Sequence, residues 1–302
     1  MTTRAKKLPS KKKTVLCLRT VAADGTAHKG FKWPALGFVE ASDWKPTAKC
    51  GNGLHGYLRG CGDAESIDWN GLFQVVKVIE SEIVDLGGKV KFPRCEVIFT
   101  GSQKDATDIL VKEYGNCSNV IGATVVVGEG QHAIAGYSGT AISTGYGGMA
   151  TVGDCGTATS AGYCGKAMAG DGGTATAGAD GTATAGYSGT ATVGDYGKAT
   201  AGDRGKATVG NHGTATVGDY GKATAGDRGT AMAGDHGTAT AGIYGTATAG
   251  GCGTAMAGDD GRISILYWDG KRYREVIGYI GENGLEPNMP YKLNDQHEFV
   301  KA

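Results

Sequence analysis

Small apolar and polar residues alternate along residues 165–260 in an eight-residue pattern that repeats twelve times without a break. Each octad reads Gly, Thr or Lys, Ala, Thr or Met, Ala or Val, Gly, a seventh residue that is most often Asp, and a variable eighth residue. A period of two predicts a β-strand from the second to the fifth position. Looser copies extend upstream to about Gly122, and the extra residue of the nine-residue copy at 156–164 predicts a β-bulge.

The side-chain directions follow from the positions that accept lysine. Lys166, Lys198, Lys206 and Lys222 occupy the second position, which must therefore face water. Alternation then turns the fourth position outward as well, and the third and fifth positions inward. The third position is always Ala and the fifth is Ala or Val, so the interior is predicted to be thin.

The rest of each octad predicts a tight corner, because Gly and Asp tolerate the left-handed backbone region. Two strand-and-corner octads then close one coil of sixteen residues with two faces. Twelve octads make six coils, which stack to about 29 Å at the usual strand spacing. We therefore expect a flattened β-solenoid over residues 121–261.

The repeat ends abruptly at its C-terminal side. Residues 262–268 supply large apolar side chains, Asp269-Gly270 predicts a hairpin turn, and residues 271–280 predict the returning strand. Because an open sheet edge pairs with other chains, residues 262–302 are expected to form a β-rich cap over the last coil.

Residues 14–120 have the composition of an ordinary packed domain. Strands are predicted at 74–79 and 95–99. Ser102 with Asp105 predicts the capped start of a helix that runs to about residue 113. We expect an α+β domain here, within a chain that is mainly β.

Composition excludes one class of protein and argues against another. The 302 residues include 55 glycines but only six prolines and no Gly-X-Y period, which excludes collagen. Thirty basic residues balance thirty acidic ones, which argues against a nucleic-acid coat. Residues 1–13 carry six basic and no acidic side chains, and we expect a flexible, solvated arm with no nucleic-acid partner.

The apolar segments and the cysteines indicate the cellular compartment of the protein. The run at 14–18 is too short for a signal-peptide core, and no stretch reaches the apolar length of a membrane span. Eight cysteines are scattered without a dense framework, as expected for reduced thiols. These features predict a cytoplasmic protein without a membrane partner.

The outward threonines form the most extended candidate surface. Thr-Ala-Thr triplets recur along the repeat, and stacking of the coils would align them into flat arrays of two columns. Lys198 on one face, Lys206 and Lys222 on the other, and outward methionines interrupt these arrays. Threonine is also common on exposed strands for packing reasons alone. The triplets contribute Thr174, Thr176, Thr182, Thr184, Thr190, Thr192, Thr214, Thr216, Thr238, Thr240, Thr246 and Thr248.

The variable eighth residues form a second candidate surface at the corners. Taken sixteen residues apart, they give one column of Tyr196, His212, Arg228 and Tyr244 and another of Arg204, Tyr220 and His236. These side chains could stack on one another or on a ligand through aromatic and cation–π contacts, or simply be solvated. Neighbouring carboxylates such as Asp203 and Asp219 would also stack, and Ca²⁺ could relieve their repulsion. The octad nevertheless lacks the second aspartate of calcium-binding β-rolls.

The octads resemble the repeats of bacterial ice nucleation proteins, and the Thr-x-Thr arrays resemble those of insect antifreeze solenoids. This resemblance implies ice binding as one hypothesis for the repeat.

One N-terminal segment has the residue types of a metal site. Cys50, His55 and Cys61 are three soft ligands in the pattern Cys-x4-His-x5-Cys. This is not a standard zinc spacing, and no fourth ligand is evident. A structural histidine in a glycine-rich turn is the alternative, and no cofactor is expected.

Most of the chain also resembles a family of bacterial and phage proteins with a shared architecture and no established activity. The resemblance implies an N-terminal domain followed by Gly-Thr-Ala octads and a related tail, and it does not include Cys61. It rests on Gly30-Phe-Lys-Trp-Pro34, Asp43-Trp44, Cys50-Gly51, Gly53-Leu-His-Gly56, residues 84–94 and Tyr267-Trp-Asp-Gly-Lys-Arg-Tyr273.

A short segment allows an enzymatic alternative. Gly53-Leu-His-Gly56 resembles the Gly-hydrophobic-Tyr/His segment of ADP-ribosyltransferases. That resemblance implies catalytic roles for Arg19 at a nucleotide phosphate, for His55, and for Glu96 at the ribose. The chain has no Walker motif, no dinucleotide fingerprint and no GxSxG elbow.

Together these patterns favour a non-catalytic structural or recognition protein. A rigid solenoid multiplies one weak contact over a large surface. Because alanine-rich coils bury little apolar area by themselves, association of two copies through a flat threonine face is expected. Ice binding, an ADP-ribosyltransferase-like enzyme and a trimeric phage or adhesin head are the alternatives.

Overall fold

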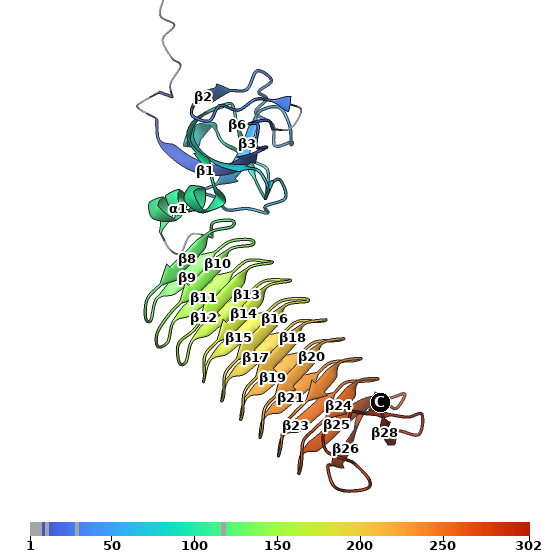
Figure 1. Cartoon of the computed structure of the whole chain (residues 1–302). Coiled ribbons are helices and arrows are strands. Elements are labelled where there is room, and N and C mark those ends of the chain that lie inside the picture. Colours follow the sequence, from blue (N-terminus) through green and yellow to red (C-terminus); the bar gives the residue numbers. More distant parts are fainter. Residues whose placement is uncertain (1–7, 10–11, 28–29, 116–118) are drawn as a thin grey trace, which may run out of the picture. The chain divides into compact units, whose positions relative to one another are not determined.

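The computed structural model describes residues 8–9, 12–27, 30–115 and 119–302 (Figure 1). The chain folds into two compact units, Met1–Val125 with Ile134–Thr140 and Val126–Ala133 with Ala141–Ala302. Most of the basic arm predicted for residues 1–13 lies outside the described residues. Within the described part, no helix is long and apolar enough to cross a membrane.

The N-terminal unit is built on a seven-stranded sheet in which every neighbouring pair is antiparallel. Its spatial order is β2-β7-β4-β1-β3-β6-β5. The elements are β1 (Thr14–Val21), β2 (Gly37–Glu40), β3 (Leu54–Leu58), β4 (Leu72–Ile79), the 3₁₀ turn η2 (Glu80–Glu82), β5 (Val84–Asp85), β6 (Val90–Phe92), β7 (Arg94–Gly101) and α1 (Gln103–Tyr114). The strands predicted at 74–79 and 95–99 are confirmed within β4 and β7.

The predicted helix is confirmed, together with its cap. Ser102 Oγ accepts a hydrogen bond from the backbone N–H of Asp105 at the start of α1. Ala106 and Leu110, one turn apart on α1, are fully buried. The main core of this unit lies on the sheet, where Cys17, Val76 and Phe92 belong to one buried cluster.

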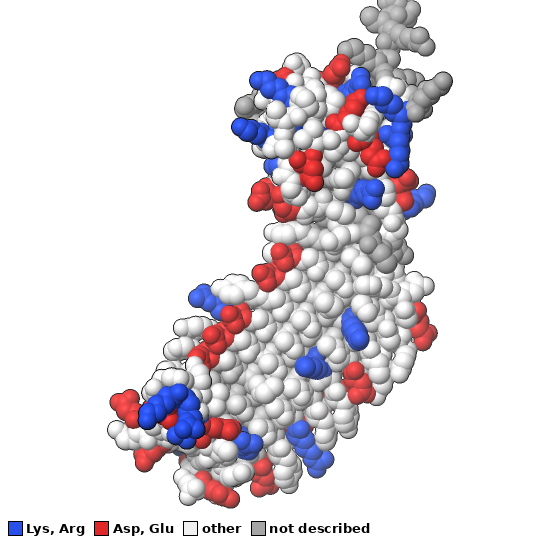
Figure 2. Space-filling view, turned by 180° about the vertical axis from the view of Figure 1, so that it is seen from behind, with Lys and Arg blue, Asp and Glu red and all other residues white. Residues whose placement is uncertain are grey.

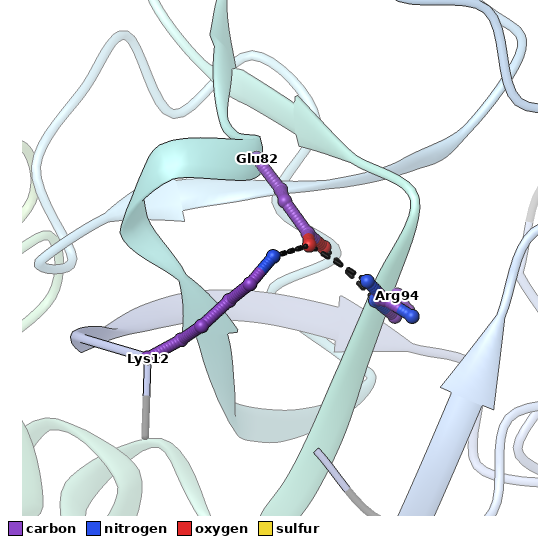
Figure 3. Close-up of polar contacts among 3 residues, drawn as sticks. All are labelled: Lys12, Glu82 and Arg94. Carbon is purple, nitrogen blue, oxygen red and sulfur yellow. Dashed lines mark hydrogen bonds and ion pairs between the residues drawn. The ribbon is translucent and has the colours of Figure 1, made fainter. Parts of the chain in front are cut away.

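An ion-pair cluster connects Lys12 and Lys13, the last residues of the predicted arm, with Glu82 and Glu80. Arg94 donates two hydrogen bonds to the Glu82 carboxylate, over 2.9 and 2.7 Å, and Lys12 Nζ donates a third over 2.9 Å (Figure 3). Lys13 pairs with Glu80 over 2.8 Å. These contacts, led by that with Arg94, lower the pKa of Glu82 to about 2.

The repeats form a β-solenoid, as predicted (Figure 1). Even-numbered strands build one sheet, here the even sheet: β8 (Thr124–Val127), β10 (Thr140–Ser143), β12 (Thr157–Ser160), β14 (Thr174–Ala177), β16 (Thr190–Val193), β18 (Lys206–Val209), β20 (Lys222–Ala225), β22 (Thr238–Thr240) and β24 (Thr254–Met256). Odd-numbered strands build the odd sheet: β9 (His132–Ala135), β11 (Met149–Val152), β13 (Lys166–Ala169), β15 (Thr182–Ala185), β17 (Lys198–Ala201), β19 (Thr214–Val217), β21 (Thr230–Ala233), β23 (Thr246–Ala249) and β25 (Arg262–Trp268).

Register confirms the sixteen-residue coil and the inward alanines. Strands β14 and β16 pair in parallel with Thr174 opposite Thr190 and Ala175 opposite Ala191. The third-position alanines, such as Ala191 and Ala207, have no exposed surface. The predicted bulge is wrong: β11 pairs with β13, and β12 with β14, residue by residue across a seventeen-residue offset. The extra residue lies in the five-residue connection between β12 and β13, so the pairing of the strands themselves stays regular.

The corner geometry also differs from the expectation. The left-handed residue is the variable eighth one, with φ of 57° at both Arg204 and Tyr220. Glycine at the sixth position is required for space instead. A Cβ on Gly210 would lie 2.1 Å from Asp195 Oδ1, because each coil packs its backbone directly on the preceding corner.

The C-terminal segment closes the last coil, as predicted, by extending both sheets. The strand β26 (Tyr273–Tyr279) pairs antiparallel with β25, and β27 (Tyr291–Leu293) pairs with β24 and with β28 (Phe299–Lys301). Ile263 and Ile265 replace the inward alanines in register. Their larger side chains are fully or almost fully buried, so the thin interior ends in an apolar layer.

Candidate functional site

The two broad faces of the solenoid carry the predicted threonines in parallel register. The triplets of β14, β16 and β22 lie on the even sheet, and those of β15, β19 and β23 lie on the odd sheet. Lysines are few and isolated on the broad surface of the repeats, and the acidic side chains gather along its margins (Figure 2). The face seen in Figure 2 is therefore largely uncharged.

The fourth-position columns distinguish the two faces. On the even sheet this column is threonine in six consecutive strands, β12 to β22, and it ends at Met256. On the odd sheet, Met168 and Met232 replace threonine in the corresponding column. The even-sheet column consists of Thr159, Thr176, Thr192, Thr208, Thr224 and Thr240.

Sequence reasoning restricted to Thr-Ala-Thr triplets missed half of this column. Thr208 and Thr224 share their strands with Lys206 and Lys222, which were counted as interruptions of the array, so these two threonines were left out. The lysines occupy the second-position column, where they lie in register with each other. The sixteen-residue spacing, applied to each position separately, would have found the threonine column.

Some of the corner residues stack on one another, which is one of the two alternatives that the sequence left open. Tyr196 and His212 lie parallel with ring centres 4.9 Å apart, and Tyr220 and His236 with centres 4.8 Å apart. Arg204 lies 5.8 Å from the Tyr220 ring centre, and Arg228 lies 5.6 Å from that of Tyr244. The first column borders a shallow groove of about 430 Å³.

The stacked aspartates have a structural role that the sequence did not reveal. Asp203 Oδ1 accepts the backbone N–H of Asp219 over 3.0 Å, and Asp219 Oδ1 accepts that of Asp235 over 2.8 Å. Each carboxylate therefore satisfies an amide of the next corner. Among the described residues, no group of three or more His, Cys, Asp or Glu side chains is placed to hold a metal ion.

Strands β1 and β3 of the N-terminal unit border a cavity of about 1120 Å³. Arg19 lines it and is only 8% exposed. Its guanidinium donates to the backbone carbonyls of His55 and Thr20, over 3.3 and 3.1 Å, and lies 3.4 Å above the Trp33 ring centre. Burial lowers the pKa of Arg19 to about 9, so the group remains a cation at neutral pH.

The three candidate zinc ligands are not gathered into a metal-binding group in the part of the chain that the structure describes. His55 Nε2 accepts the backbone N–H of Gly51 over 3.3 Å. Burial, and then the positive charges of Lys89, Lys91 and Arg19, lower the pKa of His55. Cys50 is exposed, and burial raises the pKa of Cys61, which opposes the thiolate that zinc requires.

The three residues of the enzymatic alternative are not brought together. Cys95, next to Glu96 on β7, belongs to the core cluster with Cys17 of β1. Arg19 lies two residues from Cys17 and shares its side of the sheet, so alternation places Glu96 on the opposite side. Glu96 does not line the cavity that contains Arg19 and His55.

The repeat defines a β-solenoid scaffold, and over the repeat region the chain is similar to bacterial ice nucleation proteins. It is 37% identical over 116 residues to the ice nucleation protein of Pseudomonas fluorescens, which covers 36% of this chain and 10% of that protein. It is 37% identical over 100 residues to the ice nucleation protein of Xanthomonas campestris pv. translucens, a match that covers 32% of this chain and 6% of that protein. It is 34% identical over 105 residues to ice nucleation protein InaA of Pantoea ananas, a match that covers 33% of this chain and 8% of that protein. The matched segment thus spans a tenth or less of these relatives. No family model and no solved structure matches the chain.

The predicted cytoplasmic location is wrong. Ice nucleation proteins, to which the repeat is similar, are surface proteins anchored in the outer membrane, which conflicts with that location. The prediction rested on the missing signal-peptide core and membrane span, and the absence of such segments does not assign a compartment.

Proposed function

We propose that the outer surface of the even sheet binds ice. The observation that carries this proposal is the unbroken column from Thr159 to Thr240, which repeats one hydroxyl and one methyl group over about 24 Å, five strand spacings. Each hydroxyl offers one donor and two acceptors to water. Because a solenoid strand is already ordered, aligned water costs no further ordering of the protein.

The likeness of the repeats to ice nucleation proteins supports this proposal. The face is nevertheless short beside those relatives, since the matched segment spans a tenth or less of their length. An ordered water layer is stabilised in proportion to its area. We therefore expect the chain to bind existing ice and slow its growth, with little effect on the freezing temperature of supercooled droplets.

An ice-recrystallisation assay on the full chain tests the proposal. Lysine is accepted at the outward second position, as in Lys206 of β18. The double variant Thr192→Lys/Thr208→Lys, at the equally outward fourth position, should therefore fold and interrupt the even-sheet column. The matched control Thr184→Lys/Thr200→Lys makes the same change on the odd sheet. Loss of growth inhibition in the first variant alone is the expected result. An inactive wild-type chain, or equal losses in the two variants, would refute ice binding by the even sheet.

We propose self-association through the odd sheet as a second function of the scaffold. Met168 and Met232, both exposed, lie in the fourth-position column of that sheet and give it an apolar character that the Thr159–Thr240 column lacks. Light scattering after gel filtration, over a hundredfold range of concentration, should show a dimer. Met168→Lys/Met232→Lys should shift it to monomer, and a wild-type chain that is monomeric throughout would overturn the proposal.

A further inference from the structure

The cavity of the N-terminal unit contains a buried cation, Arg19, to which the described residues supply no acidic partner. The ion pairs among the described residues do not include Arg19. Two backbone carbonyls and the Trp33 ring are its neighbours, and its Nε has no hydrogen-bond partner in the part of the chain that the structure describes. A buried charge is normally paired, because the loss of hydration otherwise costs several kcal/mol.

Other groups around the cavity add positive charge. Lys89, at its wall, donates to Ser66 Oγ over 2.7 Å. Lys91 has no exposed surface, and its Nζ donates hydrogen bonds to the backbone carbonyls of Lys49 and Gly51. Gly51 lines the cavity. Asp43 and Asp68 also line the cavity, but their carboxylates accept hydrogen bonds from Asn52 Nδ2 and from the backbone N–H of Asn70.

The walls suit a ligand with a planar ring. Phe31 lines the cavity with a ring that is 39% exposed and meets Trp33 edge to face, with ring centres 5.8 Å apart. Gly30 and Gly51, also in the lining, have open space where a side chain would stand. A volume of about 1120 Å³ accommodates a small organic molecule.

We propose that this cavity binds a small organic anion, with its phosphate or carboxylate group at the Arg19 guanidinium and its ring against Phe31. Arginine recognises both oxyanions through the same donors, so they share one chemistry. The site lies in a different unit from the threonine column and does not depend on ice binding.

Arginine Nε–H resonances of the full-length, ¹⁵N-labelled protein report directly on this contact. Inorganic phosphate, acetate, adenosine 5′-monophosphate and benzoate are titrated separately, and the peak lost in Arg19→Lys assigns Arg19. We expect its resonance to shift saturably with the nucleotide or with benzoate, and more weakly with the matching bare anion. A shift with the nucleotide and inorganic phosphate identifies a phosphate site, whereas a shift with benzoate and acetate identifies a carboxylate site. If none of the four shifts the resonance saturably, the proposal fails.

Two variants separate binding from folding. Arg19→Lys should weaken the active probe by about tenfold, because lysine loses the forked donors. Phe31→Ala, at a half-exposed side chain, should leave the fold intact and weaken the ring-bearing probe several-fold without affecting the bare anion. Arg272→Lys, an exposed change in the other unit, is the control and should bind like wild type. Unchanged affinity in Phe31→Ala would remove the ring from the proposal, and unchanged affinity in a folded Arg19→Lys would overturn it.

Discussion

Asp203 and Asp219, which a sixteen-residue spacing would place as repelling neighbours, are joined by a hydrogen bond: Asp203 Oδ1 accepts the backbone N–H of Asp219 over 3.0 Å. In the same way, Asp219 Oδ1 accepts a hydrogen bond from the backbone N–H of Asp235. Asn211 Oδ1 accepts one from the backbone N–H of Asp227 over 2.9 Å. The acceptor oxygen, which Asp and Asn share, is therefore what the seventh position supplies, and the negative charge is secondary.

Replacement of this acceptor gives the first prediction. Asp219→Ala should lower the free energy of unfolding by about 1 kcal/mol, because the backbone N–H of Asp235 loses its partner. Asp219→Asn keeps an acceptor oxygen, as Asn211 does, and should change stability by less than about 0.5 kcal/mol. Chemical denaturation measures both values. Equal destabilisation by the two variants would show that charge, not the hydrogen bond, matters at this position.

The left-handed corner residue gives the second prediction. Ser188 is exposed and has φ of 52°. Ser188→Val should destabilise the solenoid by about 1–2 kcal/mol, because a β-branched residue tolerates this region poorly. Ser188→Asn should be close to neutral, since asparagine enters the region readily. Thermal unfolding followed by circular dichroism compares them, and a neutral valine variant would contradict the corner geometry described here.

Deletions of whole octads test whether the even-sheet face carries the ice-binding activity. Removal of residues 221–228 takes out β20 and moves β21 into the even sheet, so that Met232 follows Thr208 in the threonine column. Removal of residues 221–236 takes out one coil and joins Thr208 directly to Thr240. The longer deletion should therefore retain more ice-growth inhibition than the shorter one. Circular dichroism confirms folding, and the reverse order of activity would exclude the even-sheet column as the active surface.

Acid should weaken the N-terminal unit through Glu82. Arg94, as the largest contribution, and Lys12 lower the pKa of Glu82 from 4.5 to about 2. A depressed carboxyl pKa stabilises the fold above about pH 4.5, and this contribution is lost as the pH falls towards 2. Glu82→Gln should reduce stability by about 1 kcal/mol at pH 7, with the difference from wild type disappearing near pH 2. A difference that stays constant from pH 7 to pH 2 would assign the loss to packing.

Much of the fold was predictable because every octad of the repeat has the same residue types at the same positions. Lysine at the second position and alanine at the third determine which side of each strand faces water. The helix start at Ser102 and the large residues after Gly261 were equally local signals, and both predictions were confirmed. The candidate site was less predictable. The threonine column depends on residues sixteen apart, and two of its members were hidden beside lysines.

The sequence by itself determined the period, the inward alanines and the two-sheet coil, because alternation and steric size act within a few residues. Only the tertiary structure decided the rest. It placed the left-handed φ on the eighth residue. It also made glycine necessary at the sixth residue, because packing of one coil on the next leaves no room there for a Cβ. It separated Glu96 from Arg19 across a sheet, and buried Arg19 over Trp33 with no ion-pair partner among the described residues. Such relationships join strands that are distant in the chain, and no local pattern encodes them.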